Sequence, residues 1–175
     1  MRKILLIAAA SFISTVCFGQ AIEMAPPAEM KKFDWMVGEW TSTSKWTMPD
    51  MDPIEVASSF KAEWDGQFLK QVATSDFAGF MKMTETMMLG WDAKKGEYVS
   101  YAFTNFAPTP RLEHGKLTGE TLVMVCDSWD VMGDVTSSRA TMTKVNNDQL
   151  KLKLEFKEGD KWNVVTDAVY NRVKK

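Results

Sequence analysis

The sequence predicts an all-β protein: a single up-and-down antiparallel β-barrel of about ten strands, with a short N-terminal helix closing one end. Turn-forming dipeptides such as Asp65-Gly66, Lys95-Gly96 and Gly159-Asp160 recur at strand-length intervals. Between these turns apolar and polar residues alternate with a period of two, and no helical period persists. The 175 residues suit one domain. Consecutive strands joined by short turns form a meander, which loses its open edges by closing into a barrel.

The elements follow in chain order. Residues from Ala28 to Met36 form the helical candidate, because Met30 and Phe33 lie where they could plug one end of a barrel. A sandwich with Greek-key crossovers is the alternative, but its longer connections are hard to fit between tight turns. The ten expected strands are residues 38–48, 54–64, 67–77, 80–91, 97–106, 110–117, 120–129, 134–145, 149–158 and 161–173.

Alternation also predicts which side chains face the barrel interior. The pattern is clearest near the C-terminus, where apolar residues share one face and charged residues the other; the apolar ones are Leu150, Leu152, Leu154 and Phe156. The last strand is expected to turn inward Trp162, Val164, Ala168 and Tyr170. A β-bulge would reverse the facing of the residues beyond it.

The first residues have the pattern of a secretory signal. Met1-Arg2-Lys3 is positively charged, the run from Ile4 to Val16 is mostly apolar, and small residues follow at Cys17, Gly19 and Ala21. The apolar run is shorter than the ~20 residues of a membrane-spanning helix. We therefore expect an exported protein with no integral membrane span.

The expected domain boundaries follow from this signal. We expect a signal peptide over residues 1–19, cleaved after Gly19 or Ala21, then a lead-in over 20–29 and a barrel domain over 30–175. The expected location is periplasmic or secreted, through a bacterial Sec-type signal. A lipid anchor at Cys17 is the less favoured alternative, because the preceding Val16 is larger than the residue usual there.

Composition excludes several classes of function. The net charge is −2, so no basic excess is available to hold a nucleic acid, and no such partner is expected. A single histidine, His114, argues against His-based triads and multi-His metal sites. Cleavage of the signal would leave Cys126 without a disulfide partner, and its apolar neighbours favour a buried hydrophobe over a reactive thiol.

Several short motifs carry a resemblance to a known family. Val37-Gly38-Glu39-Trp40 has the Gly-x-Trp that opens lipocalin-like barrels, and it is followed by Gly66-x-Phe68-Leu69, Leu89-Gly90-Trp91-Asp92 and Tyr170-x-Arg172. Over residues 30 to 173 the chain resembles exported bacterial proteins catalogued as domain of unknown function 1579, in the lipocalin-like (calycin-type) group. The resemblance implies a barrel like those of lipocalins and fatty-acid-binding proteins, and it supplies no activity. It also implies that Trp40 stacks with Arg172 at the closed end, as a structural pair.

Polar residues on the predicted inner faces indicate a cavity rather than a dry core. They are Ser42, Ser44, Ser58, Glu85 and Thr166. A mostly apolar pocket with a few polar groups is typical of a small-molecule site. The residues expected to bind the ligand are Trp46, Phe60, Trp64, Met83, Glu85, Met87, Met124, Arg139 and Met142.

Glu85 needs a partner or a neutral form, because an unpaired buried carboxylate is costly. We hypothesise that Glu85 meets Arg139, the mid-strand cation, inside the barrel and that the pair anchors a ligand carboxylate or hydroxyl. The alternative is that Arg139 points to solvent, because Ala140 and Met142 beside it indicate that the opposite face is inward.

Other candidate sites have simpler explanations. Met81, Met83, Met87 and Met88 suggest copper(I), yet no Cys or His joins them, and cavity lining is favoured. Related ten-strand barrels hold haem through an inward His, but His114 precedes a turn glycine and is expected to be exposed. The acidic residues Asp50, Asp52 and Glu55 lack an EF-hand spacing.

These observations favour an exported protein that binds a small hydrophobic or amphipathic molecule inside the barrel, with no cofactor, no metal and no catalysis. The alternative is a non-catalytic structural or protein-interaction barrel whose interior is filled. A third possibility is an enzyme that uses Glu85 as a general base. The ligand and the oligomeric state do not follow from the sequence.

Overall fold

The structure is a computed structural model that describes residues 24–47, 51–79, 81–131 and 134–174. Two short helical segments, α1 (Ala28–Lys31) and η1 (Asp34–Met36), precede the strands. The strands are β1 (Gly38–Trp46), β2 (Ile54–Asp65), β3 (Phe68–Phe77), β4 (Met81–Asp92), β5 (Glu97–Thr104), β6 (Arg111–Thr118), β7 (Thr121–Val131), β8 (Asp134–Asn146), β9 (Gln149–Glu158) and β10 (Lys161–Arg172).

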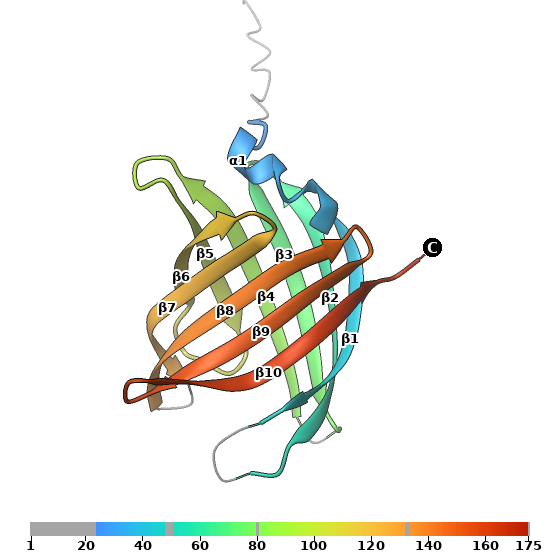
Figure 1. Ribbon diagram of the computed structural model, residues 1–175, viewed down its shortest axis with the longest axis vertical. Coiled ribbons are helices and arrows are strands. Elements are labelled where there is room, and N and C mark those ends of the chain that lie inside the picture. Colours follow the sequence, from blue (N-terminus) through green and yellow to red (C-terminus); the bar gives the residue numbers. More distant parts are fainter. Residues whose placement is uncertain (1–23, 48–50, 80, 132–133, 175) are drawn as a thin grey trace, which may run out of the picture.

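The strands form one closed barrel (Figure 1). Each strand pairs antiparallel with its sequence neighbours, and β1 closes the ring by pairing with β10, with Trp40 opposite Arg172. The prediction of a single up-and-down barrel of about ten strands with a short N-terminal helix is therefore confirmed, and the Greek-key sandwich is excluded. The predicted strand ends lie within two residues of the observed ones, because tight turns fix them.

One end of the barrel is closed by α1 and η1, which lie across it in Figure 1. Met30, Phe33 and Met36 are buried there against Trp40, which is fully buried on β1. The Trp40 indole N–H donates to the Met36 carbonyl at 2.9 Å, so the helical segment and the first strand are locked together.

Arg172 completes this closed end from the last strand. Its guanidinium lies 4.3 Å from the centre of the Trp40 ring and donates to the carbonyls of Trp35, Val37 and Asn147. The predicted Trp40–Arg172 stacking is thus confirmed. A Cβ on Gly38 would lie 2.6 Å from Arg172 Nη1, and the φ of Gly38 is +131°, so this position of the motif requires glycine.

A second pair of motifs also meets at this end. The ring of Phe68, at the start of β3, covers Gly90 on β4, where an added Cβ would come within 2.9 Å of two ring carbons. The Gly66-x-Phe68-Leu69 and Leu89-Gly90-Trp91-Asp92 motifs are therefore two halves of one packing arrangement, in which the aromatic ring needs a residue without a side chain beneath it.

A β-bulge in β10 corrects one sequence expectation. The register of β10 against β9 shifts between Val164 and Thr166, so Val164 pairs with Glu155 and Trp162 with Lys157 on the outer face. Trp162 and Val164 therefore face outward, whereas Thr166, Ala168 and Tyr170 face the interior. Alternation counted back from Tyr170 was wrong beyond the bulge because the extra residue reverses the facing.

The N-terminal predictions lie outside the described residues. They include the signal peptide over 1–19, its cleavage after Gly19 or Ala21, and the alternative anchor at Cys17. Among the residues that the structure describes, no helix has the length and apolar character needed to span a membrane.

Candidate functional site

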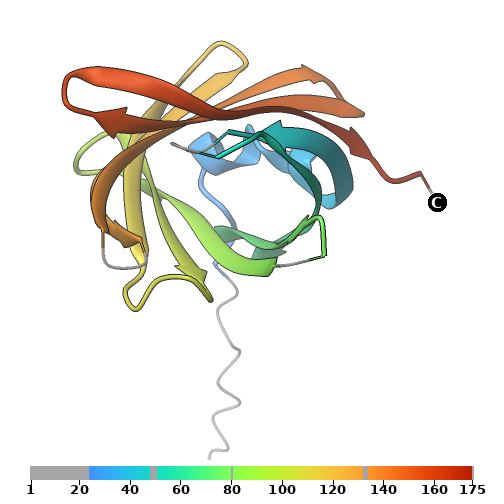
Figure 2. The same ribbon diagram turned by 90° about the horizontal axis from the view of Figure 1, so that it is seen from below.

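The half of the barrel away from α1 contains a cavity of about 230 Å³. Its lining reaches the strand ends opposite α1, at Trp46, Phe77, Met81 and Val131, and Phe106 from the β5–β6 connection joins them. Figure 2 shows the ring of strands with the helical segment at its far end. The volume is somewhat below the ~300–1,000 Å³ of most small-molecule pockets, which favours a small occupant.

Most of the cavity wall is apolar. Methionines contribute from three strands, with Met81, Met83 and Met87 on β4, Met124 on β7 and Met142 on β8. Flexible thioether side chains adapt to ligands of different shapes. The aromatic and aliphatic residues of the wall include Trp46, Phe60, Phe77, Phe106, Trp129, Leu152 and Phe156.

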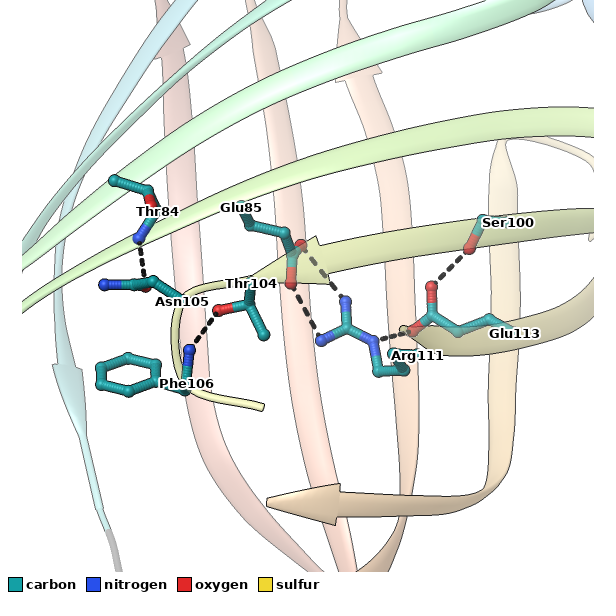
Figure 3. Close-up of polar contacts among 8 residues, drawn as sticks. All are labelled: Thr84, Glu85, Ser100, Thr104, Asn105, Phe106, Arg111 and Glu113. Carbon is teal, nitrogen blue, oxygen red and sulfur yellow. Dashed lines mark hydrogen bonds and ion pairs between the residues drawn. The ribbon is translucent and has the colours of Figure 1, made fainter. Parts of the chain in front are cut away.

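A charged cluster lies in this apolar wall (Figure 3). Arg111 on β6 forms a two-pronged ion pair with Glu85 on β4, with Nη1 3.1 Å from one carboxylate oxygen and Nη2 3.2 Å from the other. The third guanidinium nitrogen of Arg111, Nε, donates to Glu113 at 3.0 Å, and Glu113 accepts a 2.6 Å hydrogen bond from Ser100 on β5. We call Glu85, Ser100, Arg111 and Glu113 the inner polar cluster.

The inner polar cluster is well buried. The side chains of Glu85, Arg111 and Glu113 are 16%, 14% and 4% exposed. Arg111 also lies 4.9 Å from the ring centre of Trp129, which forms the wall beneath it. Burial raises the pKa of Glu85; the positive charge of Arg111 opposes that rise and the negative charge of Glu113 adds to it.

The β5–β6 connection is held against β4 near the cluster. The Asn105 side chain accepts from the Thr84 backbone N–H at 2.9 Å and donates to the Lys82 carbonyl at 3.0 Å. The Phe106 N–H donates to the Thr104 hydroxyl at 3.4 Å, and the Phe106 ring lines the cavity. These bonds extend the β4–β5 pairing past the strand end and fix the start of the segment that leads to Arg111 (Figure 3).

A second group of polar side chains lies on β1, β2, β3 and β10. The hydroxyls of Ser58 and Ser75 are 2.8 Å apart, and burial raises the pKa of the neighbouring Tyr170, whose hydrogen bond with Ser58 opposes that rise. Thr166 donates to Ser44 at 3.3 Å. The predicted inward hydroxyls are thus buried and mostly paired with one another, which leaves the cluster around Arg111 as the charged part of the wall.

Seven of the nine residues predicted to bind a ligand line the cavity. They are Trp46, Phe60, Met83, Glu85, Met87, Met124 and Met142. Trp64 is not among the lining residues: its indole N–H donates to Asp34 of η1 at 3.1 Å, and its side chain packs against the core at the closed end. Ligand binding at the seven remains a prediction.

The hypothesis that Glu85 meets Arg139 inside the barrel is wrong. Arg139 on β8 is on the outer face, where its Nε lies 2.7 Å from Glu155 and its guanidinium lies 4.6 Å from the Trp162 ring centre. Its neighbour Ala140 lines the cavity, so alternation requires Arg139 to face outward. The cation that pairs with Glu85 is Arg111.

Sequence reasoning missed Arg111, Ser100 and Glu113. Leu112 lies between Arg111 and Glu113, and its apolar side chain suggests that the charged neighbours face water. In the structure Leu112 is 50% exposed and the two charged residues are inside. A usable signal was the apolar outer face of neighbouring strands, because Tyr101 pairs with Leu112 and both are exposed.

The remaining candidates do not join the cavity. His114 is half-exposed and lies 3.0 Å from Asp127, so it is outside the barrel. Asp52 and Glu55 are exposed, and Asp50 lies outside the described residues. Burial raises the pKa of the Cys126 thiol, which fits its prediction as a buried hydrophobe. Within the described parts of the chain, no group of three or more His, Cys, Asp or Glu is placed to hold a metal ion.

Comparisons with known proteins place the fold but assign no activity. A family model described as "Protein of unknown function (DUF1579)" matches residues 25–172. No curated protein sequence matches the chain significantly. The crystal structure of Rv2717c from M. tuberculosis is similar with a TM-score of 0.64 and 15% identity, covering 85% of this chain and 99% of that one. The S-type phycobiliprotein lyase CPES from Guillardia theta has a TM-score of 0.56 and 13% identity, covering 84% and 93%.

The second structure corrects the prediction of a protein without catalysis. That prediction rested on a barrel fold with no recognisable catalytic motif, and it is wrong as an inference, because a protein with a similar barrel is named a lyase. At 13% identity the likeness shows the fold alone, so it gives this chain no reaction.

Proposed function

The chain belongs to this family of proteins of unknown function, and from the geometry of its barrel we propose that it binds a small, mostly apolar molecule inside the cavity. The cavity itself carries the proposal: a space of about 230 Å³ whose wall is apolar except for a few grouped polar side chains. That combination is typical of small-molecule sites, in which apolar contacts supply affinity and polar groups fix orientation.

The difference between the two ends of the barrel supports entry of the ligand at the end opposite α1. At the α1 end, Met30, Phe33 and Met36 are buried, and a separate pocket beside Phe33 and Trp35 is bordered by Lys32, Glu120 and Lys144. The lining of the main cavity instead extends to the strand ends opposite α1. A ligand would therefore pass Trp46 and Phe106 and reach the methionines of β4 with its apolar part. A filled barrel acting only through its surface is the weaker alternative, because side chains do not fill this half.

A cavity-filling variant tests the proposal. N-phenyl-1-naphthylamine, a neutral apolar dye whose fluorescence rises in apolar surroundings, should bind the native protein saturably with one site per chain. Ala140→Phe places a ring in the cavity and should weaken dye binding by about tenfold or more. Ala57→Phe is the matched control, because Ala57 is exposed on the outer face of β2.

Two outcomes would contradict the proposal. One is the absence of saturable dye binding by the native protein. The other is equal binding by the native protein and a folded Ala140→Phe variant, which would place the dye on the outer surface. Loss of binding by the Ala57→Phe control would likewise show that the dye binds the outer surface rather than the cavity.

Export to the periplasm or outside the cell is also part of this proposal, and it rests on the N-terminal sequence pattern. The mass of the protein purified from a bacterial host measures it. Loss of the first 19 or 21 residues would agree with signal cleavage after Gly19 or Ala21. A chain that keeps Arg2 and Lys3 in the cytoplasmic fraction would contradict it, and a lipid-sized added mass on Cys17 would favour the anchored alternative.

A further inference from the structure

The charges that line the cavity do not balance. Among the described lining residues, two side chains are acidic, Glu85 and Glu113, and one is basic, Arg111. The other polar side chains of the wall are neutral: Gln71, Ser75, Ser100, Thr166 and Tyr170. With both carboxylates ionised, the wall carries one uncompensated negative charge.

The hydrogen bonds show where that charge is least satisfied. Glu113 receives Arg111 Nε on one oxygen and the Ser100 hydroxyl on the other, and its side chain is 4% exposed. Each oxygen of Glu85 receives one N–H of Arg111, and within the described part of the chain no other donor reaches this carboxylate. A carboxylate has about four acceptor positions, so Glu85 retains acceptor capacity.

Two other cations that lie within strands form ion pairs on the outer face of the barrel. Arg139 and Lys153 both pair with Glu155 on the outer face, at 2.7 and 3.3 Å. Neither can turn inward without reversing the facing of its strand. The rise in the pKa of Glu85 on burial is consistent with this shortage, because one guanidinium shared by two carboxylates does not fully stabilise the ionised form.

We propose that the ligand is an amphipathic amine, whose protonated nitrogen binds the Glu85 carboxylate while its apolar part lies among Met83, Met87 and the aromatic wall. The proposal rests on the proposed function of the cavity. An ammonium group supplies both the missing positive charge and the N–H donors that Glu85 can accept.

The same arrangement rejects a fatty-acid-type carboxylate. A third negative charge would enter a weakly polar space that already holds two, and charge repulsion is stronger there than in water. The guanidinium of Arg111 offsets this only in part, because its single positive charge is already shared by two carboxylates, which take three of its five N–H donors. The cavity is therefore expected to discriminate by head group among molecules of equal length.

Three eight-carbon molecules test the discrimination: octylamine, octanol and octanoate, each used to displace N-phenyl-1-naphthylamine at neutral pH. Octylamine should bind more tightly than octanol by a factor of about ten or more, and octanoate should bind more weakly than octanol. In Glu85→Gln the advantage of octylamine over octanol should fall to within about threefold. Glu155→Gln is the matched control, since Glu155 is also an arginine-paired glutamate with little exposure but lies on the outer face, and it should keep the native order.

Each contrary result has a distinct meaning. Octanol or octanoate binding as tightly as octylamine to the native protein overturns the amine proposal and leaves the proposed function standing. A folded Glu85→Gln variant that keeps the full octylamine advantage also overturns it. Failure of the dye and of all three molecules to bind contradicts the proposed function itself. If Glu85→Gln does not fold, the native order alone decides.

Discussion

The two halves of the barrel use buried aromatic and charged side chains in opposite ways. At the closed end, Arg172 stacks on Trp40 and donates to three backbone carbonyls, and Asp148, a half-exposed surface residue, lies 3.4 Å from its Nε, so this cation ties the last strand to the helical segment. In the cavity half, Arg111 stacks on Trp129 but bridges two carboxylates beside open space. The same pair of residue types therefore closes the ring in one place and lines a cavity in the other.

The difference teaches how an up-and-down barrel can keep a densely packed core at one end and a cavity in the other half. Helix, first strand and last strand converge on Trp40, and a change there disturbs several elements at once. The inner polar cluster joins β4, β5 and β6, which are already neighbours in the sheet, so its loss changes the cavity before it changes the topology.

The largest expected effect is at the closed end. Trp40→Ala should lower the free energy of unfolding by about 3–5 kcal/mol, because it removes a fully buried aromatic side chain and the surroundings cannot fully collapse. Met83→Ala is the comparison in the cavity half and should cost less, about 1–2 kcal/mol, because Met83 already borders open space. Denaturant unfolding of both variants measures the difference. Equal losses would break the distinction between the two halves.

Removal of the shared cation should come next. Arg111→Met leaves Glu85 and Glu113 buried without a counter-charge, and about 3 kcal/mol of stability should be lost at neutral pH. The loss should shrink in acid, because burial raises the pKa of Glu85 and its carboxylate becomes protonated there. Arg139→Met, whose guanidinium is on the outer face, should cost less. Urea unfolding at neutral and acidic pH tests this, and a larger loss in Arg139→Met would contradict it.

A smaller effect is expected from the glycine of the Gly-x-Trp motif. Gly38→Ala should lower the unfolding free energy by about 2 kcal/mol, because the new methyl group meets the Arg172 guanidinium and the residue must keep a φ of +131°. Gly119→Ala is a control without the close contact, since nothing lies within 4 Å of an added Cβ there, although its φ is also positive. Thermal unfolding that ranks Gly119→Ala as the more damaging change would argue against a packing role for Gly38.

The pH dependence of two buried glutamates should have opposite signs. The pKa of Glu85 is raised, so its contribution to stability is present below its unfolded pKa and is lost as the pH rises through the folded pKa. The hydrogen bond from Arg139 lowers the pKa of Glu155, so that contribution is present above the unfolded pKa and is lost as the pH falls through the folded one.

Substituting each glutamate separates the two contributions. In the native protein, Glu85 lowers the unfolding free energy as the pH rises towards neutral, and Glu85→Gln should remove this decrease. Glu155 lowers the unfolding free energy as the pH falls, and Glu155→Gln should remove that decrease. Unfolding free energies measured from acidic to neutral pH report both. The expected changes are the smallest of the series, and the same sign in both variants would contradict the assignment of Glu85 to the inside and Glu155 to the outside.

Much of the fold was predictable because its signals are local. Turn dipeptides fix the strand ends, and alternation in β2 and β9 identifies their inner faces, as in Leu150, Leu152 and Leu154. The inward or outward direction of side chains was mispredicted at the β10 bulge. One extra residue before Thr166 turns Trp162 and Val164 outward, and no residue type in this stretch signals the bulge. The sequence therefore reveals the alternation of a strand but not the β-bulges that interrupt it.

The candidate site was less predictable because its partners are distant in sequence. Arg111 is inside because Glu85, 26 residues away, and Glu113 offset its charge there, and no local pattern records that pairing. Trp64 was placed correctly on an inner face, but alternation gives no depth along the barrel axis, and Trp64 lies at the closed end beside Asp34. Side-chain direction can be read along one strand, whereas pairing and depth require the closed sheet.

A crystal structure of the protein grown with octylamine tests the central claim most directly. We expect the alkyl chain between the β4 methionines and the ring of Phe106, with the nitrogen within hydrogen-bonding distance of the Glu85 carboxylate and Arg111 still in place. An empty cavity at saturating octylamine, or the molecule bound on the outer surface, would contradict the account of this half of the barrel as a binding site.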